Sequence, residues 1–288
     1  MDPHLVHGYM PNAGFESTRT AVAENLNKRF GSNFTFENII MTVGAGSSIN
    51  VIMKTIFDPG DKQVVFAPYF VEYANWASNY HAETVVVPPN EANGFEPDPE
   101  ALKKALDPKV KVVIINNPNN PTGAIYSRET LEKIAEVLKE AEKEYGHPIY
   151  IITDEPYREL VYVDKEIVFI PDLYDNTIIA YSWSKSLSIP GDRLGYLAVS
   201  PKSDNVEEFM AAATVANRIS GDTNAPSIIQ LAVERCLDAQ VDIPYYKKNA
   251  EDLYKIVTDA GFTAVVPQGA FYLWVKSPRS EERRVGKE

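Results

Sequence analysis

Short apolar runs alternate with longer amphipathic segments along most of this 288-residue sequence. Such alternation is typical of a wound α/β sheet, in which each strand is followed by a helix that covers it. The strands are expected at 39–43, 63–67, 84–87, 110–116, 149–154, 177–181 and 194–199. The helices are expected at 17–30, 47–57, 70–79, 99–105, 128–145, 204–216, 225–239 and 243–260. We therefore predict a three-layer α-β-α fold with a mostly parallel sheet.

The pattern changes after residue 240. Two apolar runs, 262–266 and 271–275, flank a Pro-Gln-Gly turn and have the spacing of a hairpin. We predict a large domain over 1–240, the start of a smaller α+β domain over 241–278, and a charged, aperiodic tail over 279–288 that is foreign to the fold.

Composition excludes several classes of function. The net charge of −12 leaves no basic surface for nucleic acid, and no apolar run reaches the length of a membrane-spanning helix. The single cysteine, Cys236, rules out an intrachain disulfide and is expected to be a small buried residue of a helix. The N-terminus lacks the apolar region of a signal peptide, so we expect a cytoplasmic protein without nucleic acid or a membrane as a partner.

One lysine stands between an apolar strand and a Pro-Gly pair in the segment 181–196. Lys185 is flanked by Trp183, Leu187 and Ile189. Burial disfavours the charged form of an amine, and an uncharged amine is a nucleophile that can condense with an aldehyde. The alternative from the residues alone is an ordinary lysine on a surface turn.

Two polar side chains stand where apolar strands end. Asp154 closes the strand 149–154, where an unpaired carboxylate would be costly, so a cationic partner or the role of a helix N-cap would account for it. Asn120 lies in an Asn-rich turn that, on composition, is only a loop.

Small residues and an aromatic group follow two earlier strands. The run Gly-Ala-Gly-Ser-Ser at 44–48 opens a helix whose free N–H groups could bind an anion. Nucleotide-binding folds use the same device, but the sequence has neither Gly-x-Gly-x-x-Gly spacing nor a Walker lysine. Phe70 could offer a stacking face or belong to the core, Tyr73 could edge a pocket, and Trp76 and Trp274 are expected in the core.

These residues share one position in the predicted sheet. Ala45, Phe70, Asn120, Asp154 and Lys185 each follow the carboxyl end of a predicted strand. Open α/β sheets bind ligands at that edge, so we expect the five residues to meet there.

Taken together, the motifs resemble those of the class I/II aminotransferases, which are pyridoxal-phosphate (PLP) enzymes of fold type I. The resemblance covers residues 9 to about 277. It is carried by Ser-x-Ser-Lys at 182–185 with an arginine eight residues on, Asp-x-x-Tyr at 154–157, Asn-Pro-Thr-Gly at 120–123 and Pro-aromatic-aromatic at 68–70.

The resemblance implies a role for each residue. Lys185 would hold PLP as an internal aldimine, Asp154 would pair with the ring nitrogen, and these two with Tyr157 would be catalytic. The other cofactor contacts would be a stacking face, donors to the ring oxygen and a phosphate site, formed by Phe70, Asn120, Tyr157, Ala45, Gly46, Ser182 and Arg193. Tyr9 would reach the phosphate in the neighbouring subunit of a homodimer, and the segment 223–226 would also cross over. No metal is implied.

The implied reaction moves an amino group between an L-amino acid and a 2-oxo acid by a ping-pong mechanism. A fold type I lyase or decarboxylase would use the same cofactor residues and is one alternative. An inactive truncated fragment is another, because family members carry an N-terminal arm and a substrate-binding arginine in the small domain that this sequence lacks. Arg218 could recognise an acidic side chain, although a plain surface arginine explains it as well.

Overall fold

The computed structural model describes residues 7–277, and the predicted tail over 279–288 lies outside the described residues. Seven strands form one sheet in the order β1-β7-β6-β5-β4-β2-β3. β7 runs antiparallel to both neighbours, and the remaining pairs are parallel. The strands are β1 (Ile39–Thr42), β2 (Lys62–Phe66), β3 (Glu83–Val87), β4 (Val110–Asn116), β5 (Tyr150–Asp154), β6 (Thr177–Ser182) and β7 (Gly195–Val199). The prediction of a mostly parallel sheet is therefore confirmed.

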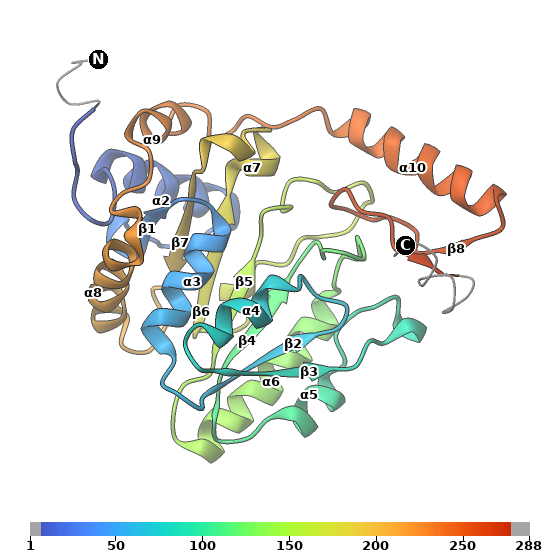
Figure 1. The fold of residues 1–288 in the computed structure, drawn as a ribbon, viewed down its shortest axis with the longest axis horizontal. Coiled ribbons are helices and arrows are strands. Elements are labelled where there is room, and N and C mark those ends of the chain that lie inside the picture. The colour runs from blue at the N-terminus through green and yellow to red at the C-terminus, as the bar shows by residue number, and fades with distance from the viewer. Residues whose placement is uncertain (1–6, 278–288) are drawn as a thin grey trace, which may run out of the picture.

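Helices cover both faces of the sheet, as the central strands require: β5 and β6 are fully buried, and β4 is buried at every residue except Lys111. One face carries α3 (Ala45–Ile56), α4 (Glu72–Ser78) and α8 (Val206–Asn217), with α3 and α4 in front of the strands in Figure 1. The other face carries α5 (Pro99–Ala105), α6 (Arg128–Tyr145), α2 (Glu16–Phe30) and α9 (Ser227–Val233). The fold is thus a three-layer α-β-α sandwich.

The helix α6 shows how the sequence sets these elements. The Ser127 side chain accepts the Thr130 N–H at the N-terminus, and Gly146 ends the helix in the left-handed region. Leu131, Ile134, Ala135, Leu138 and Ala141 form its buried stripe. None of the helices between residues 7 and 277 is long and apolar enough to cross a membrane.

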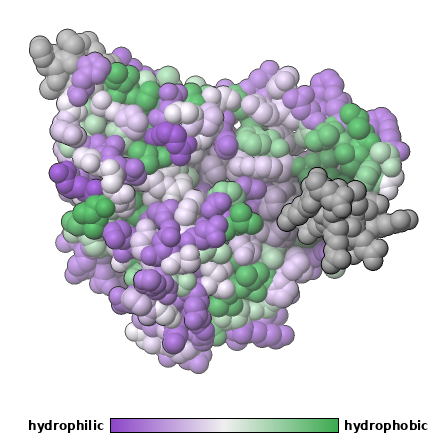
Figure 2. Space-filling model, viewed as in Figure 1, coloured by the Kyte–Doolittle hydropathy of each residue, from purple (hydrophilic) through white to green (hydrophobic). Residues whose placement is uncertain are grey.

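The region after residue 240 stands at the side of the sheet (Figure 1). α10 (Ile243–Asp259) has no buried residue, and Figure 2 shows apolar side chains gathered below it. The exposed apolar residues of this region include Leu253, Ile256, Phe262, Val266 and Trp274. The expectation that Trp274 lies in the core is wrong, since its side chain is 36% exposed.

Two further expectations fail in the second half of the chain. β8 (Thr263–Ala264) pairs with β9 (Val275–Lys276), so the hairpin exists, but its strands are shorter than predicted and leave out residues 271–274. α9 ends at Val233 instead of 239, because the Cys236 N–H bonds to the Val233 carbonyl in a tighter turn. Cys236 is consequently exposed and not a buried helix residue.

Candidate active site

A pocket of about 380 Å³ opens at the edge of the sheet where β1, β2, β4, β5 and β6 end. Residues that follow each of these strands line it, although they are far apart in the sequence. The lining consists of Ala45, Gly46, Ile49, Phe70, Trp76, Asn120, Asp154, Pro156, Tyr157, Ser182, Ser184, Lys185, Pro190, Arg193 and Tyr272. All predicted site residues except Tyr9 are in this set.

Asp154 ends β5 and presents a buried carboxyl group to the pocket. Its Oδ2 accepts a 2.5 Å hydrogen bond from the Tyr73 hydroxyl, while its buried Oδ1 has no hydrogen-bond partner among residues 7–277. Burial raises the pKa of Asp154 to about 7, against the lowering effect of the Tyr73 bond. An unpaired buried oxygen that faces a pocket is suited to a cationic or N–H-bearing ligand.

Asn116, at the end of β4, holds the backbone of Asp154. Its side-chain amide donates to the Asp154 backbone carbonyl over 2.8 Å, and its Oδ1 accepts the Asn120 N–H over 2.6 Å. The ends of β4 and β5 are therefore tied together, and the turn that carries Asn120 is held over the pocket.

Lys185 enters from the short helix α7 (Trp183–Ser186) that follows β6. Its side chain is half-buried, and its Nζ lies 5.1 Å from the centre of the Phe271 ring. Burial lowers the pKa of Lys185, and the charge of Arg193 lowers it further. The structure thus places an amine that loses its proton more easily than usual in the same pocket as Asp154.

The start of α3 forms an end of the pocket that is suited to an anion. Ala45 and Gly46 are the first helical residues, and the opening N–H groups of a helix have no partner within it. The Arg193 guanidinium lies beside them and donates to the carbonyls of Val43 and Pro190 over 3.0 and 2.8 Å. A Cβ on Gly44 would meet Arg193 Nη2 at 2.8 Å, so only glycine allows this approach.

Aromatic rings form another part of the pocket wall. Phe70 is half-buried and packs edge-on against Tyr73 and Trp76, with ring centres 5.6 and 5.9 Å apart. Tyr73 is fully buried behind Phe70 and does not line the pocket, so the expectation that it edges the pocket is wrong. Trp76 lines the pocket instead of belonging only to the core.

Tyr157 contributes a hydroxyl group, and Tyr272 meets it. The two hydroxyl oxygens are 2.7 Å apart. Burial raises the pKa of Tyr157, so its hydroxyl stays protonated and can donate. Sequence reasoning missed Tyr272, because the apolar run 271–275 indicated a strand of the predicted small domain.

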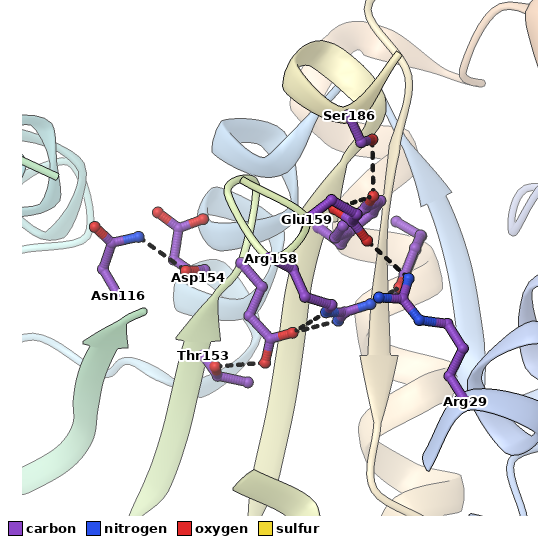
Figure 3. Close-up of polar contacts among 10 residues, drawn as sticks. Arg29, Asn116, Thr153, Asp154, Arg158, Glu159 and Ser186 are labelled. Atoms are coloured by element: carbon purple, nitrogen blue, oxygen red, sulfur yellow. Dashed lines mark hydrogen bonds and ion pairs between the residues drawn. The ribbon is translucent and has the colours of Figure 1, made fainter. Parts of the chain in front are cut away.

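A buried polar network supports the pocket from behind (Figure 3). Arg158 Nε donates to Glu155 Oε2 over 2.5 Å, and Thr153 Oγ1 donates to the other oxygen of Glu155 over 2.7 Å. The side chains of both Arg158 and Glu155 are less than 5% exposed. This ion pair follows Asp154 directly and holds the turn after β5 in place.

A second chain of contacts reaches the helix that carries Lys185. Arg29 on α2 donates to Glu159 over 2.7 Å, and the Tyr181 hydroxyl donates to the other oxygen of Glu159 over 3.0 Å. The same hydroxyl lies 2.8 Å from the Ser186 hydroxyl. In Figure 3 these contacts run from Arg29 through Glu159 to Ser186. They anchor α7 at Ser186, the residue after Lys185.

Tyr9 does not reach the pocket of its own chain and is 92% exposed. The adjacent residue Met10 donates its N–H to the Asn224 side chain over 3.4 Å, and Asn224 donates to the Pro11 carbonyl over 3.1 Å. The segments around Tyr9 and 223–226 therefore share one surface. Arg218 lies outside the pocket and donates to Asn12 over 2.9 Å.

The pocket brings together five chemical elements: an amine of lowered pKa, a buried carboxyl group with one unpaired oxygen, hydroxyl and amide donors, an anion-binding helix start and an aromatic wall. A flat heterocycle that carries an aldehyde and a phosphate would match them all. No group of His, Cys, Asp or Glu in the described part of the chain could hold a metal ion.

The chain is similar in sequence to known proteins. Residues 2–285 match the family described as "Aminotransferase class I and II". The aspartate/prephenate aminotransferase of Thermus thermophilus is 33% identical over 92% of this chain and 68% of its own length. The aspartate aminotransferase of Pyrococcus horikoshii is 33% identical over 92% of this chain and 67% of its own length.

Solved structures agree with this relationship. A crystal structure of an aminotransferase from Eubacterium rectale superposes with a TM-score of 0.93 at 40% identity, over 96% of this chain and 69% of that one. An aspartate aminotransferase of Thermus thermophilus superposes with a TM-score of 0.84 at 29% identity, over 94% and 70%. The chain belongs to the class I/II aminotransferases, a PLP-dependent family with the aspartate aminotransferase fold.

Proposed function

We propose that this chain binds PLP in the pocket and moves an amino group between an L-amino acid and a 2-oxo acid by a ping-pong mechanism. The observation that carries the proposal is that Asp154 and Lys185 both line one pocket. A buried carboxyl oxygen without a partner fits the ring nitrogen of PLP, and an amine of lowered pKa fits its aldehyde.

The remaining residues fit the rest of the cofactor. Ala45, Gly46, Ser182 and Arg193 would hold the phosphate, because they combine helix N–H groups, a hydroxyl group and a guanidinium group. Other lining residues would offer a stacking face and donors to the ring oxygen, namely Phe70, Asn120 and Tyr157.

PLP, when bound, withdraws electrons from the bonds around the substrate Cα. Asp154 would hold a proton on the ring nitrogen, which strengthens this withdrawal. Tyr157 would donate its hydroxyl proton to the ring oxygen. Lys185 Nζ, once free and uncharged, would take the proton from the substrate Cα as a general base. Its lowered pKa keeps more of the amine in the basic form near neutral pH.

We also propose a homodimer with shared active sites. Support comes from Tyr9, which is 92% exposed, and from its neighbours, which bond to Asn224 on the same surface. Exposed apolar side chains lie on nearby elements, namely Val215, Ile219 and Ile228. For the substrate, the names of the Thermus and Pyrococcus relatives make aspartate the first amino acid to test.

The first experiment tests covalent binding of PLP. The purified chain is incubated with PLP, reduced with borohydride and digested, and the modified peptide is identified by mass spectrometry. We expect the modification on Lys185, its loss in Lys185→Ala, and its retention in Lys202→Ala, which changes an exposed lysine outside the pocket. Modification elsewhere, or equal modification of Lys185→Ala, would contradict the proposal.

The second experiment tests the reaction. The PLP-loaded chain with aspartate should release oxaloacetate in an amount equal to the loaded sites, and continued turnover should require an added 2-oxo acid. A lyase or decarboxylase would turn over without the 2-oxo acid. Release of ammonia or carbon dioxide in its absence would therefore favour that alternative.

A further inference from the structure

The turn at residues 268–272 belongs to the hairpin region but is bonded to the large sheet domain. The N–H groups of Gln268 and Gly269 both donate to the Gly123 carbonyl, over 3.1 and 3.0 Å. The Ala270 N–H donates to the Leu160 carbonyl over 2.9 Å. These three backbone hydrogen bonds hold the turn against the large sheet domain.

Gly269 makes this close contact possible. A Cβ at this position would lie 2.7 Å from the Leu160 carbonyl oxygen and 3.0 Å from Pro118 Cβ. Any larger residue would therefore push the turn away from the site. The residues that follow bring Phe271 beside Lys185, and Tyr272 into the pocket beside Tyr157.

The contacts of these two rings are specific. The Tyr272 hydroxyl oxygen lies 2.7 Å from that of Tyr157, and the two rings meet edge-on with centres 5.7 Å apart. The Phe271 ring meets Tyr157 at 88° and lies 5.1 Å from Lys185 Nζ. The charged or titratable groups around this cluster are Asp154 beside Tyr157, Arg193 beside Lys185, and Tyr73 on Asp154.

The direction of the bond between the two tyrosines follows from their chemistry. A tyrosine hydroxyl has one proton to donate. If Tyr157 donates that proton to the ring oxygen of PLP, as proposed above, the 2.7 Å bond must be donated by Tyr272. Hydrogen bonds in such a chain polarise one another, so the outer donor strengthens the inner one.

We propose that Tyr272 is a positioning residue that acts through Tyr157 and controls how strongly Tyr157 donates to PLP. The inference rests on the proposed function. A stronger donor draws negative charge from the ring oxygen. The ring oxygen then stabilises the protonated form of the nearby Lys185–PLP nitrogen less, so this nitrogen holds its proton less tightly. Tyr272 should therefore lower the pH at which that nitrogen loses its proton.

The experiment titrates the visible absorption band of the PLP-loaded chain against pH. Four chains are compared with the unchanged one: Tyr272→Phe, Tyr157→Phe, the double variant, and Tyr246→Phe as a control. Tyr246 stacks on Phe271 at 6.2 Å, so its variant removes a hydroxyl group from the same aromatic cluster without reaching Tyr157.

We expect Tyr272→Phe to raise the midpoint of the titration by roughly half a pH unit to one unit, the size expected of one neutral hydrogen bond. Tyr157→Phe should raise it at least as much, and the double variant should match Tyr157→Phe alone. Tyr246→Phe should leave the midpoint unchanged.

Three results would overturn the inference. These are an unchanged midpoint in Tyr272→Phe, an equal shift in Tyr246→Phe, or a full additional shift when Tyr272→Phe is added to Tyr157→Phe. In each case PLP would still be bound through Lys185. A chain that forms no visible band with PLP would instead overturn the proposed function, and the inference with it.

Discussion

We predict that the buried carboxyl group of Asp154 lowers the stability of the chain without PLP near neutral pH. The pKa of this group is about 7 in the folded chain, compared with 3.8 for an unperturbed aspartate. Burial causes the shift, since one oxygen has only Tyr73 as a partner and the other has none among residues 7–277. The ionised form is therefore disfavoured by folding.

The sign of the pH dependence follows directly. Because the pKa is raised on folding, the folded state holds the proton more tightly than the unfolded state. The contribution of Asp154 to the free energy of unfolding is therefore greatest below pH 4 and falls as the pH rises to about 7. A difference of about three pKa units corresponds to about 4 kcal/mol above pH 7.

The perturbation is Asp154→Asn, which keeps the shape and the acceptor for Tyr73 but cannot ionise. Urea unfolding of the chain without PLP should show the variant about 4 kcal/mol more stable than the unchanged chain at pH 8, with similar stabilities at pH 4. Asp238→Asn is the control, since Lys28 lowers the pKa of that exposed carboxyl group and gives the opposite sign.

With PLP added at pH 8, the unchanged chain should be the more stable of the two. The protonated ring nitrogen of PLP would pair with the Asp154 carboxylate, and an asparagine side chain carries no charge to form that pair. The reasoning would be refuted if the two stability curves ran parallel from pH 4 to pH 8, or if the variant were the less stable chain at pH 8 without PLP.

Two further predictions concern groups that shape the pocket. Arg158→Met should lower the free energy of unfolding by about 3–5 kcal/mol, measured in urea, because it leaves the Glu155 carboxylate buried without its ion pair; an unchanged value would show that the pair is solvated. Gly44→Ala should weaken PLP binding by roughly tenfold or more, measured by fluorescence quenching, since the new Cβ would displace the Arg193 guanidinium. The control is Gly60→Ala, which shares a positive φ but has open space around it, so it should alter stability and leave PLP affinity unchanged.

The sequence predicted the sheet because its strands are distinctive. β5 is buried along its whole length and β4 at every residue except the half-buried Lys111, and each contains an apolar run that ends at a polar residue. The same logic places Asp154 and Asn120 in one pocket, since parallel strands end at a common edge. Neither prediction depends on contacts between distant residues.

The second half of the pocket could not be predicted in this way. Tyr272 lies in an apolar run that favours a strand, and only the bonds from Gly269 and Ala270 to the carbonyls of Gly123 and Leu160 turn it toward Tyr157. Trp76 reaches the pocket because Gly46 has no Cβ, which would otherwise lie 3.1 Å from the indole ring. Such close approaches depend on tertiary structure and leave no periodic signal.

The reversed strand β7 explains how the two cationic groups come to share the pocket. β6 ends at the pocket edge, and β7 begins there because it runs the other way, with Ser182 opposite Gly195. The connection of 183–194 therefore starts and finishes at the same edge and carries Lys185 and Arg193 on its two sides. A parallel β7 would have placed its first residue at the far edge of the sheet. The charge of Arg193, which lowers the pKa of Lys185, is thus a consequence of strand direction.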